Sequence, residues 1–205
     1  MDFVQHLFIG FFMAFAGLLP PGMLNMTAMK TAVSVNKKAG FLFSLGAALL
    51  VIPPAFIALY FANFFAQHPD IIDNLSFVGV IVLFLLSGFF FWLARRKNSK
   101  ESKVQSGNFF FMGMLMSMLN MLAIPYYLVY STLLEARDLL VLERNYILFF
   151  VFGAFLGAFS LFTLFVLLSD VLIKRAKYIA RNLNYLLSIL FFFLAISTLI
   201  KLFNN

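Results

Sequence analysis

Long apolar runs, separated by short clusters of charged and turn-forming residues, dominate the pattern along this chain. Each run is close to the ~20 residues that an α-helix needs to cross a bilayer. The runs are apolar on every face and longer than the ~10-residue alternating strands of a membrane barrel, so they predict helices. The predicted spans are Leu7–Met29, Gly40–Phe65, Leu75–Leu93, Phe109–Leu134, Tyr146–Leu168 and Leu183–Phe203.

Composition narrows the class of protein. Hydrophobic residues make up 63% and charged residues 11% of the 205 residues, and the mean hydropathy is +1.00. No water-soluble fold of this size can bury that much apolar surface. A soluble enzyme, a disordered segment and a nucleic-acid-binding module are therefore excluded. The sequence has no cysteine, which also excludes disulfides and thiolate metal sites.

The net charge of +7 is informative through its distribution. Twelve of the 15 Lys and Arg residues lie in three alternating links between spans, at 30–38, 95–103 and 174–181. The positive-inside rule places these links in the cytoplasm and both termini outside. The first apolar run meets prolines where a signal peptide would have a cleavage site, so we interpret it as a retained span.

The polar stretch 97–108 divides the chain into halves at 1–96 and 109–205, each with three spans. With three spans each, the halves enter the membrane from opposite faces, which is the arrangement of an inverted repeat in transporters. A local likeness sets Phe12-Met13-Ala14 against Phe111-Met112-Gly113. The expected fold is an all-α integral membrane protein with six transmembrane helices as two inverted three-helix repeats, N-out and C-out.

Both halves carry an irregularity near the middle of their first span. Pro20-Pro21-Gly22 should break the first span, because proline lacks a backbone donor and clashes with the preceding turn. Asn120 and Pro125 occupy the matching region of the fourth span. Unpaired backbone groups in hydrocarbon cost several kcal/mol, so such breaks are expected to line a cavity. The alternative is a packing kink whose freed groups bond to hydroxyls or water.

Neutral residues are the candidates for binding, because no Asp, Glu, Lys or Arg lies well inside a span. The half-helix after the first break presents free N–H groups to an anion. Amides and phenols can pair with the carboxylate and ammonium of a zwitterion without a buried charge. The predicted substrate-binding residues are Pro20, Pro21, Gly22, Asn25, Asn120, Pro125, Tyr126 and Tyr127. For the polar ones, interhelical hydrogen bonding at about 0.6 kcal/mol is the alternative role.

Other features have simpler interpretations. No catalytic, cofactor or metal site is predicted, and His6 and His68 are expected to be solvated or interfacial. Asp170 is interpreted as an interfacial anchor at the end of the fifth span. Gly153 and Gly157 permit close helix approach. Pro53-Pro54 interrupts the second span, either to shape the cavity or only to kink the helix.

Two motifs resemble the LysE/RhtB family of amino-acid exporters. That family has Pro-Gly-Pro in its first span, followed at a fixed distance by a basic pair before Ala-Gly. Here Pro21-Gly22-Met23 precedes Lys37-Lys38-Ala39-Gly40 with matching spacing, and Gly46 fits the next glycine. Gly113 and Asn120 match the family's fourth span, where Met121 and Leu122 replace its Pro-Lys.

The resemblance implies export of amino acids from the cytoplasm, driven by a proton or ion gradient. The expected protein is a secondary-active transporter of amino acids or similar small zwitterions in the cytoplasmic (plasma or inner) membrane, with no enzymatic activity and no cofactor. Its expected partners are the solute, the bilayer and the gradient, with a homo-oligomer possible. The alternatives are a non-transporting scaffold or accessory subunit, or a cation transporter, which would need intramembrane carboxylates.

Overall fold

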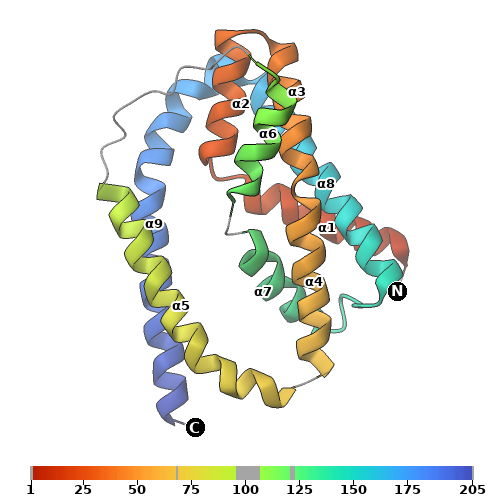
Figure 1. The fold of residues 1–205 in the computed structure, drawn as a ribbon, viewed down its shortest axis with the longest axis vertical. Helices are drawn as coiled ribbons and strands as arrows, with labels where there is room; N and C mark the ends of the chain where they lie inside the picture. Colours follow the sequence, from red (N-terminus) through yellow and green to blue (C-terminus); the bar gives the residue numbers. More distant parts are fainter. Residues whose placement is uncertain (1, 68, 96–106, 121–122, 205) are drawn as a thin grey trace. The chain divides into compact units, whose positions relative to one another are not determined.

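A computed structural model describes residues 2–67, 69–95, 107–120 and 123–204 (Figure 1). All regular structure in these ranges is helical, and they contain no strand. The helices are α1 (Phe3–Leu18), α2 (Met23–Ser34), α3 (Lys37–Leu49), α4 (Ile52–Gln67), α5 (Pro69–Arg95), α6 (Phe109–Met118), α7 (Ala123–Glu135), α8 (Arg144–Leu167) and α9 (Ser169–Asn204). The chain forms two compact units, Met1–Ala66 with Val104–Lys177, and Gln67–Lys103 with Tyr178–Asn205.

Among the described residues, the helices that are long and apolar enough to cross a bilayer lie in the first unit. Two uninterrupted apolar stretches, Lys37–Phe64 and Arg144–Leu167, are long enough by themselves. Two further helix pairs are long and apolar enough when taken together, and each is either a broken span or a re-entrant loop; α1 and α2 meet at 79° and α6 and α7 at 64°. These four segments correspond to the predicted first, second, fourth and fifth spans.

The predicted third and sixth spans lie within α5 and α9. Their described apolar stretches are shorter, at Leu83–Trp92 and Ser188–Ile200. The count of six spans therefore stays a prediction. The basic link expected between the fifth and sixth spans is helical instead, because α9 begins at Ser169 and continues through residues 174–181.

Glycines bring two helix pairs of the first unit into backbone contact. A Cβ on Gly10 of α1 would overlap the Phe150 carbonyl of α8, and a Cβ on Gly153 would overlap the Leu7 carbonyl. Gly157 meets the Phe11 carbonyl in the same way, so the predicted small-residue face is confirmed. Because Leu7 faces Gly153 and Phe11 faces Gly157, α1 and α8 run in the same direction.

The same contact recurs between α3 and α6. A Cβ on Gly46 would overlap the Phe110 carbonyl, and a Cβ on Gly113 would overlap the Phe43 carbonyl. Gly10 and Gly153, and likewise Gly46 and Gly113, each face the carbonyl three residues before the other glycine of the pair. Backbones this close leave no room for any side chain at these positions, which fixes both crossings.

The prolines of the second span do not redirect it. Pro53 and Pro54 fall in the first turn of α4, where backbone donors have no partner inside the helix. The Val51 N–H still donates to the Ala48 carbonyl, and the Ala55 N–H to the Val51 carbonyl. As a result α3 and α4 together form one stretch long enough to span.

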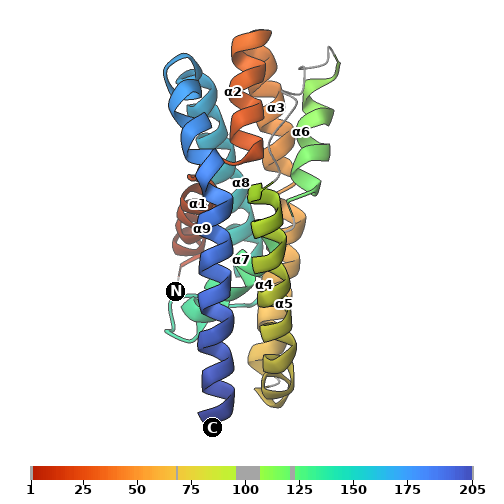
Figure 2. The ribbon, with the colours of Figure 1, turned by 90° about the vertical axis from the view of Figure 1, so that its left-hand side faces the viewer.

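In the second unit, α5 and the later part of α9 lie side by side (Figure 2). The Ser87 hydroxyl donates to the Ser188 carbonyl at 3.0 Å, and the Ser188 hydroxyl donates to the Ser87 carbonyl at 3.0 Å. Phe84 packs edge-on against Phe192, and Phe90 stacks on Phe191. A reciprocal pair of buried hydroxyls thus joins the two helices within their apolar stretches.

Candidate functional site

The predicted break in the first span is confirmed. Helix α1 ends at Leu18 and α2 begins at Met23, with Gly22 as an N-cap that has no side-chain hydrogen bond. Pro21 is buried, whereas Pro20 is exposed and Gly22 is half-buried. The two prolines cannot continue the backbone hydrogen bonds of α1, so the chain turns through the 79° bend.

Asn25 holds the two sides of this break together. Its side chain is buried, and its Nδ2 donates to the Leu18 carbonyl at 2.7 Å and to the Pro20 carbonyl at 3.1 Å. These carbonyls have no partner in a continuing helix. The Asn25 amide therefore satisfies the acceptors that the break exposes, a role that the sequence analysis considered only as the alternative to substrate binding.

Asn25 also leaves one polar atom unpaired. Its Oδ1 is buried and accepts no hydrogen bond within the part of the chain that the structure describes. Asn25 belongs to the first turn of α2, whose first backbone N–H groups have no intrahelical acceptor. An acceptor oxygen and a helix N-terminus with free donors thus occupy the same break. Together they offer complementary partners for an ammonium group and a carboxylate.

The fourth span breaks between α6 and α7. Leu119 caps α6, the Asn120 N–H donates to the Ser117 carbonyl, and the Ala123 N–H donates to the Asn120 carbonyl. Met121 and Leu122, the family departures, lie outside the described residues. Pro125 is exposed in the first turn of α7, where its missing donor is not needed. Pro125 therefore belongs to the start of α7, after the break that it was expected to produce.

Tyr126 connects the two breaks. Its hydroxyl donates to the Met13 carbonyl of α1 at 2.8 Å. Its ring lies against Gly17, where a Cβ would come within 2.6 Å of the ring carbon that bears the hydroxyl. Gly17 is thus a site residue that the sequence analysis missed. No local pattern marks it, because its partner is more than one hundred positions away.

The neighbouring tyrosines have different surroundings. Tyr127 is 3% exposed and packs edge-on against Phe150 of α8. Tyr130 is 48% exposed, and its ring lies 4.8 Å from that of Tyr126. Of the predicted site residues, the structure brings Tyr126 to α1 directly and packs Tyr127 into the same core. The Asn120 side chain has no such contact with the first break among the described residues.

A groove of about 650 Å³ runs between α1 and α7, on the α1 side of the break. Its lining is mostly apolar, with the amide of Gln5 and the two phenols as polar groups. The lining residues are Gln5, Phe8, Ile9, Phe12, Met13, Ala16, Tyr126, Tyr130 and Leu134. The groove carries no charged side chain, which agrees with the neutral candidates found in the sequence.

His6 corrects an expectation from the sequence. It is fully buried in the protein rather than solvated. The Val141 N–H donates to its Nε2 at 2.9 Å, and its Nδ1 lies 3.2 Å from the Asp2 carbonyl. The ring therefore joins α1 to the loop before α8. His68 lies outside the described residues.

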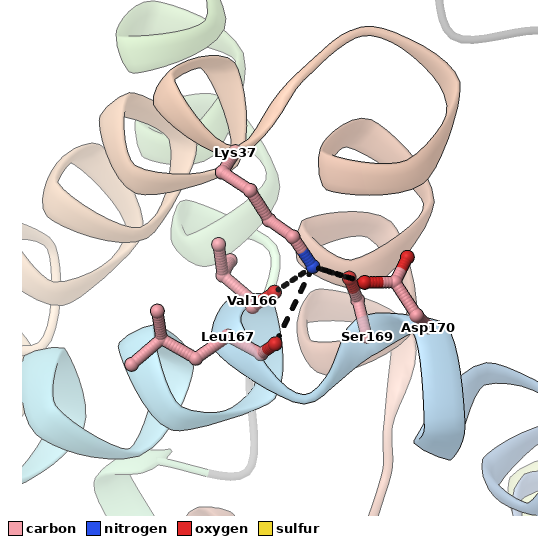
Figure 3. A network of polar contacts seen from close by, with 5 residues as sticks. All are labelled: Lys37, Val166, Leu167, Ser169 and Asp170. Carbon is pink, nitrogen blue, oxygen red and sulfur yellow. Dashed lines mark hydrogen bonds and ion pairs between the residues drawn. The ribbon is translucent and has the colours of Figure 1, made fainter.

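Lys37 and Asp170 form a polar network at the other end of the unit (Figure 3). The Lys37 Nζ lies 2.8 Å from Asp170 Oδ2, 2.7 Å from Ser169 Oγ, 3.0 Å from the Val166 carbonyl and 3.4 Å from the Leu167 carbonyl. One ammonium thus caps the C-terminus of α8 and pairs with the start of α9. Asp170 was expected to be an interfacial anchor, and its pairing with Lys37 was not predicted.

Metal binding finds no support in the described ranges, where no group of three or more His, Asp or Glu side chains could hold an ion. Comparison with curated proteins and with solved structures gave no match. A family comparison did give one, to the LysE-type translocators over residues 15–202. LysE-type translocators transport solutes such as amino acids across membranes, and the match confirms the resemblance seen in the motifs. The chain belongs to the family of LysE-type translocators.

Proposed function

We propose that this protein is a secondary-active transporter that exports amino acids or similar small zwitterionic solutes from the cytoplasm. The observation that carries the proposal is the break at Pro20-Pro21-Gly22, where the buried, unpaired Oδ1 of Asn25 adjoins the uncapped N-terminus of α2. Family membership supports transport, and the break supplies a neutral site of the right chemistry. The proposed location is the cytoplasmic (plasma or inner) membrane.

The proposed recognition pairs each end of a zwitterion with a fixed group. The solute carboxylate accepts hydrogen bonds from the N–H groups of Met23 and Leu24 and benefits from the positive end of the α2 dipole. The solute ammonium donates to Asn25 Oδ1. Asn120 and the phenols of Tyr126 and Tyr127 orient the rest of the solute. Because solute and site are both neutral overall, binding leaves no net charge in the apolar interior.

An inverted repeat with N-out and C-out orientation completes the proposal. The reciprocal glycine contacts support it, since α1 packs on α8 as α6 packs on α3. These pairs join the first span of each half to the second span of the other half. The second unit likewise combines the predicted third span with the predicted sixth. Such exchange is what two inverted halves would produce, and rocking of the halves would expose the site alternately.

The test is transport by the purified protein in lipid vesicles. We expect an imposed proton or ion gradient to drive movement of at least one member of a panel of labelled amino acids. Asn25→Ser should reduce that transport at least tenfold, because the shorter side chain cannot keep both the clamp and the acceptor. The matched control is Thr132→Val, which removes a hydroxyl bound to the Leu128 carbonyl within α7.

Two results would contradict the proposal. If no panel member moves under any imposed gradient, the exporter assignment is wrong, and a scaffold or accessory role becomes the better explanation. If the panel moves but the Asn25 variant transports as well as the Thr132 control, the protein is a transporter whose site lies elsewhere.

A further inference from the structure

We propose that the seam where α2, α3 and α8 meet is the cytoplasmic half of the solute pathway in its closed state, and that Lys37 is the latch that holds it shut on Asp170. This inference rests on the proposed function, because the proposed export and orientation define which side of the protein is cytoplasmic. It rests on four features of the structure, which are the Lys37 network, the tight packing below it, two unpaired hydroxyls, and an open groove beyond the break.

The network around Lys37 ties three helices together at one end of the unit (Figure 3). Lys37 belongs to the first turn of α3, while its acceptors lie at the end of α8 and the start of α9. The Lys37 side chain is 38% exposed and that of Asp170 is 69% exposed. Water therefore reaches the pair, so it can open and re-form without leaving a charge stranded in apolar surroundings.

The packing directly below the latch leaves no passage. A Cβ on Gly40 of α3 would come within 3.0 Å of both the Ala32 side chain of α2 and the Val166 side chain of α8. Ala28, Ala32 and Val166 are themselves almost fully buried. The three helices thus touch through small residues, one turn after Lys37 along α3. A solute could pass from the break to this end only if these helices separate.

Two helices of the seam, α2 and α8, carry buried hydroxyls that are unpaired among the described residues. Thr27, Thr132 and Thr198 each donate to the carbonyl four residues earlier, as a threonine in a helix commonly does. The buried hydroxyls of Thr31 on α2 and Thr163 on α8 have no partner in the described parts of the chain. A buried, unsatisfied hydroxyl is costly. Its presence is explained if the open state exposes it to water or solute.

The two sides of the break differ in this structure. Beyond the break, toward α1 and α7, the groove of about 650 Å³ is open. Toward Lys37, the seam is closed and latched. A transporter that alternates access must have one side closed while the other is open. The structure therefore has the pattern of a state that opens away from the proposed cytoplasmic side.

The natural absence of cysteine makes a direct test possible. A single reporter, Thr31→Cys, lies on α2 between the break and the latch and is fully buried. Its rate of reaction with N-ethylmaleimide is measured in inside-out membrane vesicles, alone and combined with Lys37→Met or Asp170→Asn. We expect Lys37→Met to raise the rate about fivefold to tenfold, equivalent to about 1–1.4 kcal/mol of closed-state stability. Asp170→Asn, which leaves the other acceptors of Lys37 in place, should raise it less.

Matched controls separate latch opening from misfolding. Lys38→Met removes the adjacent exposed charge and should leave the rate unchanged. A Val33→Cys reporter on the exposed side of α2 should react at one rate in every background. Exchanging the charges, Lys37→Asp with Asp170→Lys, should restore slow labelling at Thr31→Cys.

The latch is contradicted if Thr31→Cys reacts no faster in Lys37→Met, or if Lys38→Met accelerates it equally. Labelling needs no solute, so the two proposals fail separately. A labelling response without transport of any amino acid would contradict the exporter alone. Transport combined with a labelling rate that does not depend on Lys37 would contradict the latch alone.

Discussion

Replacing Asn25 by leucine tests whether the amide holds the first break together. The change removes two donors at nearly constant volume and leaves the Leu18 and Pro20 carbonyls without the bonds they accept at 2.7 and 3.1 Å. Each of these part-buried carbonyls costs about 1–3 kcal/mol when it loses its partner. The change also removes the buried, unpaired Oδ1, which returns about 1–3 kcal/mol. The expected net loss of stability is about 1–3 kcal/mol.

The assay is thermal unfolding of the purified protein in detergent. A loss of this size lowers the Tm by about 2–4 °C per kcal/mol for a chain of 150–250 residues. Thr27→Val is the matched control, since it removes a hydroxyl bonded to the Met23 carbonyl in the same helix at a half-buried position. If the Tm of Asn25→Leu is no lower than that of the native protein and of Thr27→Val, the amide does not hold the break together and the reasoning fails.

Further predictions concern packing and the second unit. Gly113→Leu should lower the free energy of unfolding by about 3 kcal/mol or more, because its Cβ would meet backbone atoms. A Cβ at Gly88 would meet nothing within 4 Å, so Gly88→Leu should be nearly neutral. Denaturation in detergent compares the two variants. Tyr126→Phe should lose about 0.6 kcal/mol and leave the groove's shape intact, so a larger loss would show a wider role for the hydroxyl. Ser87→Ala and Ser188→Ala should each lose a similar amount in the same assay, and a stabilised variant would contradict the reciprocal bonds.

The sequence predicted what depends on local composition and backbone chemistry. Long apolar runs predicted helices in a membrane because few other structures satisfy backbone groups there. Pro20-Pro21-Gly22 predicted the break between α1 and α2 because two consecutive prolines remove two donors. Pro53-Pro54 shows the limit of that argument. The same dipeptide in the first turn of α4 removes donors that were already unpaired, and the direction of the span is kept.

The site was predicted less completely because its key contacts join distant positions. Tyr126 was identified as polar and near the second break, but its bond to Met13 depends on how α7 crosses α1. His6 was expected to be solvated or interfacial because it lies in no apolar run. It is buried, and the Val141 N–H donates to it from a loop 135 positions away. The sequence likeness sets Ala14 against Gly113. In the structure, the glycine of α1 that packs as Gly113 does is Gly10, one helical turn before Ala14.

The contact of α1 with α8 also determines when this protein can finish folding. The chain is made from its N-terminus, so α1 enters the bilayer long before the ribosome reaches Gly153 and Gly157. Until α8 is made, the surface of α1 around Gly10 has no backbone to pack against, and α1 contacts lipid or a chaperone. Any fragment that stops before Arg144 lacks the helix on which α1 packs. Truncated chains of this protein should therefore be substrates for membrane quality control, even when they contain every residue of the first break.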